Sequence, residues 1–348
     1  MAHHVVMASS TAQARDQVAA LARADLPVGE LGDELSAALG GVVPHEGYCL
    51  IGFDPASGLR IFIASRHGLV NSHERLWHNE NVEHDLHRFT DLGRRPDPVG
   101  TLGGRGRGEA RSPRLHEILP EHGFSRELRL ALRGHDILWG ALVLLREHGR
   151  PPFSDEEADA TRAIAQPLTQ AVQRTSVRAR RQVPPPLPPG VAIVGPDGTA
   201  EAISPQAAAW FSDLYLTGSL TAEHPLPHVV LHAAAAARRD PQPRPGQLAR
   251  IRTRSGRWLS LAACPLGGGR VAVVLQPATS DQLLPAMAAW HEFTPRQLDV
   301  LHLLEQARPI KQIARRLQLS PHTVEDHLKT LYRKTGTNSQ QELLAALR

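Results

Sequence analysis

Residues 293–347 read FTPRQLDVLHLLEQARPIKQIARRLQLSPHTVEDHLKTLYRKTGTNSQQELLAAL. Apolar residues recur in this stretch at the three- and four-residue spacing of amphipathic helices. Helix-start signals stand at Thr294, Ser320 and Ser339, and Gly336 is a helix-stop signal. Together these signals predict a small unit built only of helices.

The second and third expected helices are close enough to form a helix-turn-helix. Apolar spacing marks the second from Ile310 to Leu317, and only three residues separate Leu317 from Pro321, where the third begins. This is the length of a corner between a support helix and a recognition helix. On a helical wheel, one side of the third helix is an apolar stripe formed by Val324, Leu328 and Leu331. We expect this stripe to be buried. Its opposite face is polar and carries His322, Asp326, Lys329 and Arg333, with Glu325 on the flank.

The polar face has the chemistry to meet DNA. Lys329 can donate to guanine O6 or N7, and Glu325 or Asp326 can accept from cytosine N4 in the major groove. Basic residues around them suit phosphates, which set register without reading sequence: Lys311, Arg315, Arg316, Arg333 and Lys334. Two other interpretations stay open, a solvated helix face at the acidic positions and a helical bundle that binds protein.

The stretch resembles the DNA-binding domain of LuxR-type (GerE-like) transcription regulators. The resemblance rests on Thr294, the Ile313-Ala314 pair, the S-x-x-T-V-x-x-H run from Ser320 to His327, and the K-x-G at Lys334–Gly336. It implies a four-helix head whose last helix makes a dimer contact. The base contacts that it implies are Glu325, Asp326 and Lys329. The expected backbone contacts are Lys311, Arg315, Thr323, His327, Arg333 and Lys334.

The sequence departs from the family pattern at a few positions. Gln297 and Asp299 replace two glutamates that are common in the first helix. Arg308-Pro309 replaces a glycine-containing turn, and Gln340 stands where an arginine is typical. These departures concern the turn after the first helix and the anchoring of the fourth.

Charge supports DNA binding modestly. All three lysines of the chain fall in its last forty residues, and from His291 onward nine Lys and Arg stand against six Asp and Glu. This surplus of three provides most of the whole-chain net charge of +4. So small a surplus predicts weak, salt-sensitive non-specific binding, so we expect the protein to bind DNA as a homodimer.

Length and composition predict a multidomain protein of the cytoplasm. A chain of 348 residues suits two or three domains. Cys49 and Cys264 lie in strand-like runs and are expected to be buried, reduced thiols. We expect no leader peptide, and the longest apolar run, Ile137–Leu145, is less than half a membrane span.

The N-terminal half reads as mixed α and β. Its expected elements are a helical stretch at 12–39, a hairpin of 48–53 and 59–64, a helix through Leu86 and Phe89, a Gly- and Arg-rich loop at 100–108, strands 127–132 and 137–145, and a closing helix from Ser154 to about Thr175. This order resembles a GAF-type sensor domain, which implies a small-ligand pocket between sheet and helices. The pocket residues and the ligand are unknown.

The middle segment has a similar pattern on a smaller scale. Its expected elements are a hairpin of 191–194 and 199–203, a helix capped by Ser204, an Ala-rich helix at 228–238, and strands 249–253, 258–263 and 271–276. This order resembles a PAS-type domain. The predicted division is 1–177 GAF-like, 178–190 an Arg/Pro-rich linker, 191–278 PAS-like, 279–290 a linker helix and 291–348 the DNA-binding domain.

No pattern in the sequence points to a catalytic centre, a cofactor or a metal. The histidine-rich stretch holds His67, His73, His78, His84 and His87, with Glu80 and Glu83 among them, but their spacing is not that of a closed zinc site. The glycines of 103–108 lack the lysine and the strand-to-helix context of a phosphate-binding loop. Nor is there a nucleophile elbow. We therefore expect a protein that is not an enzyme and needs no cofactor.

The fold class expected is multidomain α+β, with GAF- and PAS-like antiparallel sheets before an all-α four-helix LuxR-type head. The function expected is a sequence-specific DNA-binding transcription regulator. Its partners would be double-stranded promoter DNA and a second copy, with RNA polymerase and a small-molecule ligand as further candidates, and no membrane. The alternative is a ligand-binding or scaffolding protein whose C-terminal helical domain binds a protein partner.

Overall fold

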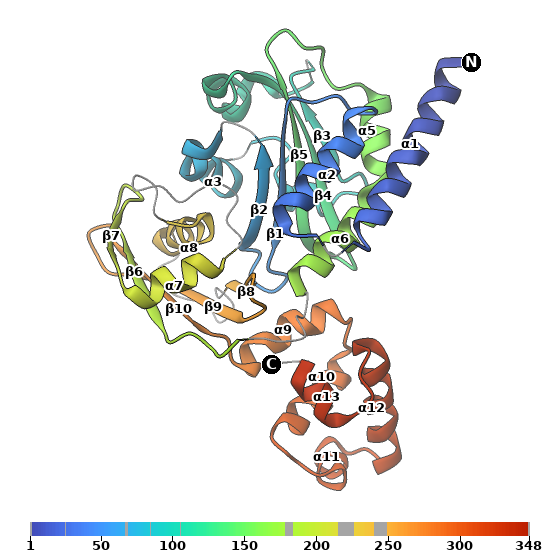
Figure 1. Cartoon of the computed structure of the whole chain (residues 1–348), viewed down its shortest axis with the longest axis vertical. Coiled ribbons are helices and arrows are strands. Elements are labelled where there is room, and N and C mark those ends of the chain that lie inside the picture. The colour runs from blue at the N-terminus through green and yellow to red at the C-terminus, as the bar shows by residue number, and fades with distance from the viewer. Residues whose placement is uncertain are drawn as a thin grey trace.

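The structure is a computed structural model, and it describes residues 2–24, 26–66, 69–83, 85–104, 106–177, 184–214, 226–239 and 249–346. It contains two antiparallel five-stranded sheets followed by a helical unit (Figure 1). The α+β class predicted from the sequence is confirmed. Three predicted features fall partly outside the described residues: the spacer at 178–183, the histidines His67 and His84, and Arg105 of the glycine-rich loop.

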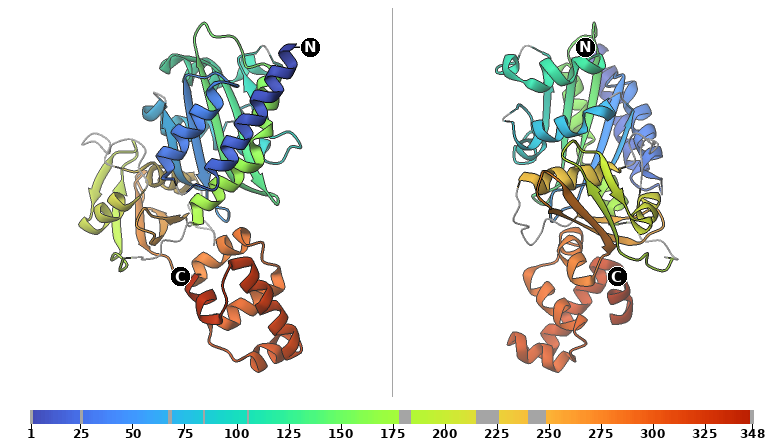
Figure 2. Two further views of the ribbon diagram at one scale, coloured as in Figure 1. Left: turned by 45° about the vertical axis from the view of Figure 1, so that its right-hand side comes forward. Right: turned by 90° about the vertical axis from the view of Figure 1, so that its left-hand side faces the viewer.

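The first sheet has the strand order β2-β1-β5-β4-β3. Its strands are β1 (Gly47–Phe53), β2 (Arg60–Arg66), β3 (Val99–Leu102), β4 (Phe124–Gly134) and β5 (Ile137–Glu147). Helices α1 (Ala2–Leu21), α2 (Val28–Gly40), α5 (Asp155–Ala163) and α6 (Ala165–Val177) cover one face, and α3 (His73–Asn81) and α4 (Phe89–Leu92) lie on the other (Figures 1 and 2). Short helical turns complete it at η1 (Leu69–Ser72), η2 (Glu109–Arg111), η3 (Arg114–Ile118) and η4 (Pro120–His122).

Alternation along the strands assigns each side chain to one face. On β1, Leu50 joins the core beneath α1, α2 and α6, whereas Cys49 and Ile51 join the core beneath α4. On β4, Leu128 and Leu130 point to the helix-covered face that includes α6. Both faces of the sheet are therefore covered, which explains why β1 and β5 read as almost continuous apolar runs.

A buried ionic cluster occupies the α3 side of this sheet. The Arg114 guanidinium, fully buried, lies 2.7 Å from Glu127 and 3.6 Å from Asp85. Arg129 lies 3.0 Å from Glu127 and 2.7 Å from Glu80. Burial alone would raise the pKa of Glu127, but the two neighbouring guanidinium groups hold it below its usual value. Charged side chains therefore fill space between sheet and helices, where the GAF resemblance had implied a ligand pocket.

The second sheet repeats the strand order of the first, β7-β6-β10-β9-β8. Its strands are β6 (Gly190–Val194), β7 (Ala200–Ile203), β8 (Ala249–Arg252), β9 (Trp258–Pro265) and β10 (Val271–Pro277). Its helices are α7 (Pro205–Asp213) and α8 (His228–Arg239). Ser204 caps α7 as predicted, since its hydroxyl accepts from the Ala207 amide at 3.1 Å.

Several local predictions are wrong. The segment at 100–108 is not all loop, because its first residues form the edge strand β3, paired with β4. Leu86 does not share a helix with Phe89, since α3 ends at Asn81 and α4 begins at Phe89. Of the two cysteines only Cys49 is buried; Cys264 is exposed.

The closing helix after Ser154 is also interrupted. It divides into α5 and α6 at Ile164, although the capping box of Ser154 and Glu157 is present. Apolar periodicity continues across the break, which is why the sequence did not reveal it.

The C-terminal unit follows the predicted plan. A connecting helix α9 (Ser280–Trp290) leads to α10 (Pro295–Glu305), α11 (Ile310–Leu317), α12 (Pro321–Thr335) and α13 (Gln340–Ala346). Their apolar faces form one core, in which Val300, Ile313, Leu331 and Leu343 are fully buried. Across the described ranges, no helix combines the length and the apolar character that a bilayer crossing requires.

A buried ion pair joins the two sheets. Asp54, at the β1–β2 turn, is fully buried and lies 3.2 Å from the Arg250 guanidinium of β8. The same carboxylate accepts from the Arg250 amide at 2.7 Å and from the Ala56 amide at 2.8 Å. One side chain thus shapes its own turn and fixes the neighbouring sheet.

Asp54→Ala should destabilise the two-sheet part of the chain by about 3–5 kcal/mol, because it removes the carboxylate that pairs with the buried Arg250 charge. Urea unfolding followed by far-ultraviolet circular dichroism measures the change. Glu121→Ala is the control: it removes an exposed pair with Arg75 and should cost about 1 kcal/mol or less. Equal, small effects of both substitutions would contradict the role given to Asp54.

Candidate nucleic-acid interface

Helix α12 is defined by strong signals at both ends. The Ser320 hydroxyl accepts from the Thr323 amide at 3.0 Å, and Pro321 occupies the first turn. Gly336 ends the helix with φ 69°, a left-handed conformation that glycine adopts without strain. The predicted stripe of Val324, Leu328 and Leu331 is buried. The register of α12 is thereby fixed, and so is the direction of its polar face.

The polar face of α12 is open to solvent. His322, Glu325, Asp326 and Lys329 each keep more than half of their side-chain surface exposed. The Lys329 ammonium lies 3.3 Å from Asp326, and the His322 ring lies 3.7 Å from Asp326 and 3.9 Å from Glu325. Exposed pairs of this kind contribute about 0–1 kcal/mol. These side chains can therefore exchange their contacts for those with another partner at little cost.

Helix α11 presents a second basic surface. Lys311, Arg315 and Arg316 are exposed, while Ile313 and Ala314 pack into the core. Figures 1 and 2 show α11 at the end of the helical unit that is remote from both sheets. The corner to α12 is closed by the Leu319 amide, which donates to the Ala314 carbonyl at 2.8 Å. The predicted phosphate-facing residues of α11 thus share one accessible surface.

The predicted backbone-contact residues of α12 differ in exposure. Arg333 is exposed, whereas Thr323 in the first turn and His327 near the middle of the helix are half-buried. The Thr323 hydroxyl lies 2.8 Å from that of Ser320. Arg333 is the residue of this set best placed for a phosphate.

Lys334 turns inward. Its ammonium donates to the Glu292 carbonyl and, at 3.0 Å, to the Gln297 side-chain oxygen. The Lys334 carbonyl lies 3.1 Å from His291 Nδ1. These bonds tie the end of α12 to the start of α10. A phosphate contact by Lys334 stays a prediction, and it requires this ammonium to leave its partners.

The family departures are accommodated locally. Gln297 completes a capping box with Thr294, so the amide replaces a glutamate in that role. At the turn before Pro309, Ala307 adopts φ 55°, which is strained for a residue with a Cβ. In the fourth helix the Glu342 amide donates to the Ser339 hydroxyl at 3.1 Å, while its carboxylate accepts from the Asn338 amide at 2.7 Å. The predicted Ser339 cap is present, although the return bond goes to the residue before it.

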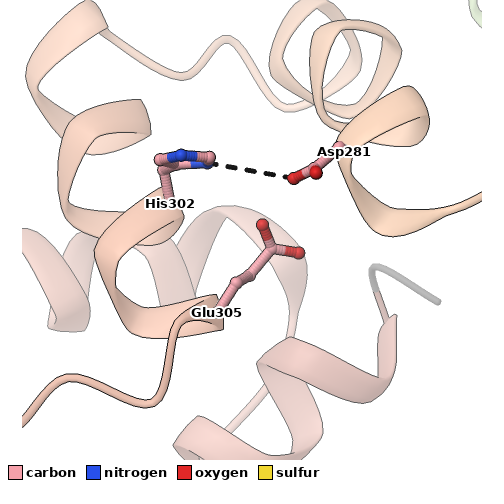
Figure 3. Close-up of side chains that lie close together, drawn as sticks. All are labelled: Asp281, His302 and Glu305. Atoms are coloured by element: carbon pink, nitrogen blue, oxygen red, sulfur yellow. Dashed lines mark ion pairs between the residues drawn. The ribbon is translucent and has the colours of Figure 1, made fainter.

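A further cluster lies between the connecting helix and the helical unit. Asp281, His302 and Glu305 bring their ligand-type atoms within 4.8 Å of one another (Figure 3). The His302 ring lies 4.0 Å from Asp281, and both side chains are more than half exposed. The donor types suit a divalent metal, but the same spacing suits a surface ion pair of a protonated histidine. The sequence did not indicate this cluster, because Asp281 comes from a different helix.

Comparisons with known proteins place the helical unit. Residues 291–346 match the family model described as "Bacterial regulatory proteins, luxR family". The response regulator Rre1 of Synechocystis sp. is 45% identical over 53 residues, which are 15% of this chain and 23% of that protein. The nitrate/nitrite response regulator protein NarL of Escherichia coli K12 is 40% identical over 52 residues, 15% of this chain and 24% of NarL. The helical unit is thus a LuxR-type helix-turn-helix domain, and the chain spans about a quarter of the length of these curated relatives.

Solved structures resemble larger parts of the chain only weakly. Escherichia coli SdiA covers 92% of this chain, and 90% of SdiA is matched, with 13% identity and a TM-score of 0.34. The GAF domain of a phosphoenolpyruvate-protein phosphotransferase from Coxiella burnetii covers 48% of this chain, and 95% of that domain is matched, with 15% identity and a TM-score of 0.32. TM-scores this low do not establish a shared fold.

Lys334→Ala should destabilise the helical unit by about 1–2 kcal/mol, because it removes a charged donor from the carbonyl of Glu292 and from the side chain of buried Gln297. The neighbouring Arg333→Ala should change stability by about 0.5 kcal/mol or less, since its side chain is exposed. Thermal unfolding of the two variants measures the difference. If Arg333→Ala proves the more destabilising, the inward placement of Lys334 is not what holds α12 to α10.

Proposed function

We propose that this chain is a sequence-specific DNA-binding transcription regulator that binds promoter DNA as a homodimer. The observation that carries the proposal is the polar face of α12, which is solvent-exposed and held in register by a buried stripe within a LuxR-type domain. In this proposal α12 enters the major groove. The base contacts are Glu325, Asp326 and Lys329, and the backbone contacts are Lys311, Arg315, Thr323, His327, Arg333 and, once released, Lys334.

The two sheets would form the sensory part of the regulator. We propose a GAF-like domain at 1–177 and a PAS-like domain at 191–278, joined by the segment 178–190. The segment 279–290 then leads to the DNA-binding domain at 291–348. The matching strand order of the two sheets supports assigning them to related sensor classes. Both would act by binding a small molecule or by pairing subunits, without catalysing a reaction.

Several partners follow from this role. A DNA target implies that the protein works in the cytoplasm, where RNA polymerase would be a second partner. Each head carries only a modest positive charge. A dimer would contact the phosphate backbone with two heads and so bind more tightly than one head alone. Two heads would then contact half-sites about one helical turn apart.

Selection of bound fragments from a genomic library, followed by gel-shift titration, tests the proposal. Lys329→Ala combined with Arg333→Ala should weaken binding by about tenfold or more and should lower the salt-dependence slope by roughly one per lost phosphate contact. Arg150→Ala, an exposed arginine of the first sensor unit, should bind as the unsubstituted protein does. Unchanged affinity in the double variant would favour the alternative, a helical domain that binds a protein partner.

The acidic positions have a separate test. If Glu325 accepts from a cytosine, Glu325→Gln should relax the preference at one base pair, with a loss of about 1–3 kcal/mol of discrimination. Competition gel shifts against operators substituted at single positions measure it. A uniform change across all base pairs would mean that Glu325 lies on a solvated face and reads no base.

A further inference from the structure

A cavity of about 440 Å³ lies between the first sheet and helix α8 of the second unit. One wall comes from the β1–β2 turn, α3 and the start of β5, and the other from small residues of α8, among them Ala233 and Ala236. Three aromatic rings line it: Phe53, Trp77 and Phe89. Its volume is within the range of small-molecule sites. Residues from both sensor units are therefore needed to build it.

The acidic side chains in its wall already have cationic partners. Glu80 lies 2.7 Å from the Arg129 guanidinium, and Asp54 lies 3.2 Å from that of Arg250. Both carboxylates also accept backbone amides, from Phe89 and from Arg250 respectively. Asp136, the third acid of the wall, lies 3.8 Å from the Arg133 guanidinium. Each of the three carboxylates therefore has an ion-pair partner other than Arg60.

Arg60 is the exception among the charged groups of the wall. Within the described ranges its guanidinium has no carboxylate within 4.0 Å, and its hydrogen-bond contact is with His232 Nε2 at 3.5 Å. Burial lowers the pKa of Arg60, an effect that the charge of Glu80 partly offsets. His228, one turn before His232 on α8, has its pKa lowered to about 4, first by burial and then by the charge of Arg60. The half-buried Arg60 guanidinium therefore places a positive charge at this end of the cavity.

We propose that this cavity binds a small organic anion, with a carboxylate on Arg60 and an apolar body against the aromatic rings. A guanidinium offers a planar pair of N–H donors that matches a carboxylate, and low-dielectric walls strengthen the pair. The apolar lining would contact the rest of the ligand, since the acidic side chains that line the cavity, Asp54, Glu80 and Asp136, each have an ion-pair partner. This site would give the proposed sensor role a class of ligand. The binding itself does not depend on that role, but any regulatory effect of binding rests on the proposed function.

Binding would act on the contact between the two sensor units. Arg60 belongs to β2, while His232 and the alanines belong to α8, so an occupant touches both units at once. The same interface contains Asp54, whose partner Arg250 also donates to the Gln282 carbonyl of α9. A ligand that tightens this interface thus acts next to the helix that leads to the DNA-binding head.

Phenylacetate and its neutral analogue phenylacetamide test the site on the full chain without DNA. Ligand-observed saturation-transfer NMR and calorimetric titration should show phenylacetate binding and an affinity for phenylacetamide about tenfold or more lower. Arg60→Met should lose phenylacetate binding by a similar factor. Arg66→Met is the matched control on the same strand, because Arg66 is exposed and paired with Asp33, and it should bind as the unsubstituted chain does.

A second variant changes the wall of the cavity that α8 provides. Ala236→Leu adds volume to the α8 wall and should also weaken phenylacetate binding, whatever Arg60→Met does to folding. The proposal is overturned if phenylacetate fails to bind at up to about 10 mM, if the amide binds as well as the acid, or if Arg60→Met retains full affinity. Because no DNA is present, a failure here leaves the DNA-binding result untouched, and the reverse also holds.

Discussion

The guanidinium of Arg250 connects three parts of the molecule. It bonds to Asp54 at the turn of the first sheet, it belongs to β8 of the second sheet, and it donates to the Gln282 carbonyl at the start of α9. Both charged side chains of the pair are almost completely buried, and desolvation makes such a pair costly unless its hydrogen bonds are satisfied. Here the carboxylate also holds two backbone amides in its own turn. The pair therefore fixes how the β1–β2 turn, β8 and the start of α9 lie relative to one another, more than it adds to the net free energy of folding.

From α9 a line of aromatic rings runs into the DNA-binding unit. Trp139, in the core of the first sheet, meets Trp290 edge-to-face with ring centroids 5.6 Å apart. His291 follows and stacks on Phe293 at 5.4 Å, and Phe293 belongs to the core of the helical unit. Beside them His135 of the β4–β5 turn lies 3.0 Å from Glu292. The end of α12 joins this junction through Lys334, so the recognition helix is anchored where the first sheet makes contact.

Sequence reasoning succeeded where a local rule decides the structure. Helix caps at Ser204, Thr294 and Ser320 depend on neighbouring residues only, and the buried stripe of α12 follows from helical geometry. It failed where pairing or exposure depends on distant segments. The edge strand β3 begins in a glycine-rich run and forms because β4 offers a free edge. Cys264 lies in an apolar run, yet it is exposed.

The candidate sites divide in the same way. The polar face of α12 could be predicted because one helix supplies all of it. The inward turn of Lys334 depends on Gln297, thirty-seven residues earlier. The anion site depends on Arg60 and His232, which are 172 residues apart. Periodicity carries no information about such a pair, so the cavity between the first sheet and α8 could not be predicted from the sequence.

The strength of the ionic contacts differs between the scaffold and the recognition surface. Inside the first sheet, Arg114, Glu127 and Arg129 form short contacts away from water, and breaking one would leave a buried charge without compensation. On α12, Asp326 meets Lys329 and His322 in solvent at 3.3 and 3.7 Å, where each contact contributes little. In the proposed DNA complex these side chains exchange their contacts for phosphates and bases, and only weak, exposed pairs can be exchanged at little cost. The scaffold uses the other, buried kind: the Asp54–Arg250 pair also bonds to α9, the helix that leads to the DNA-binding domain.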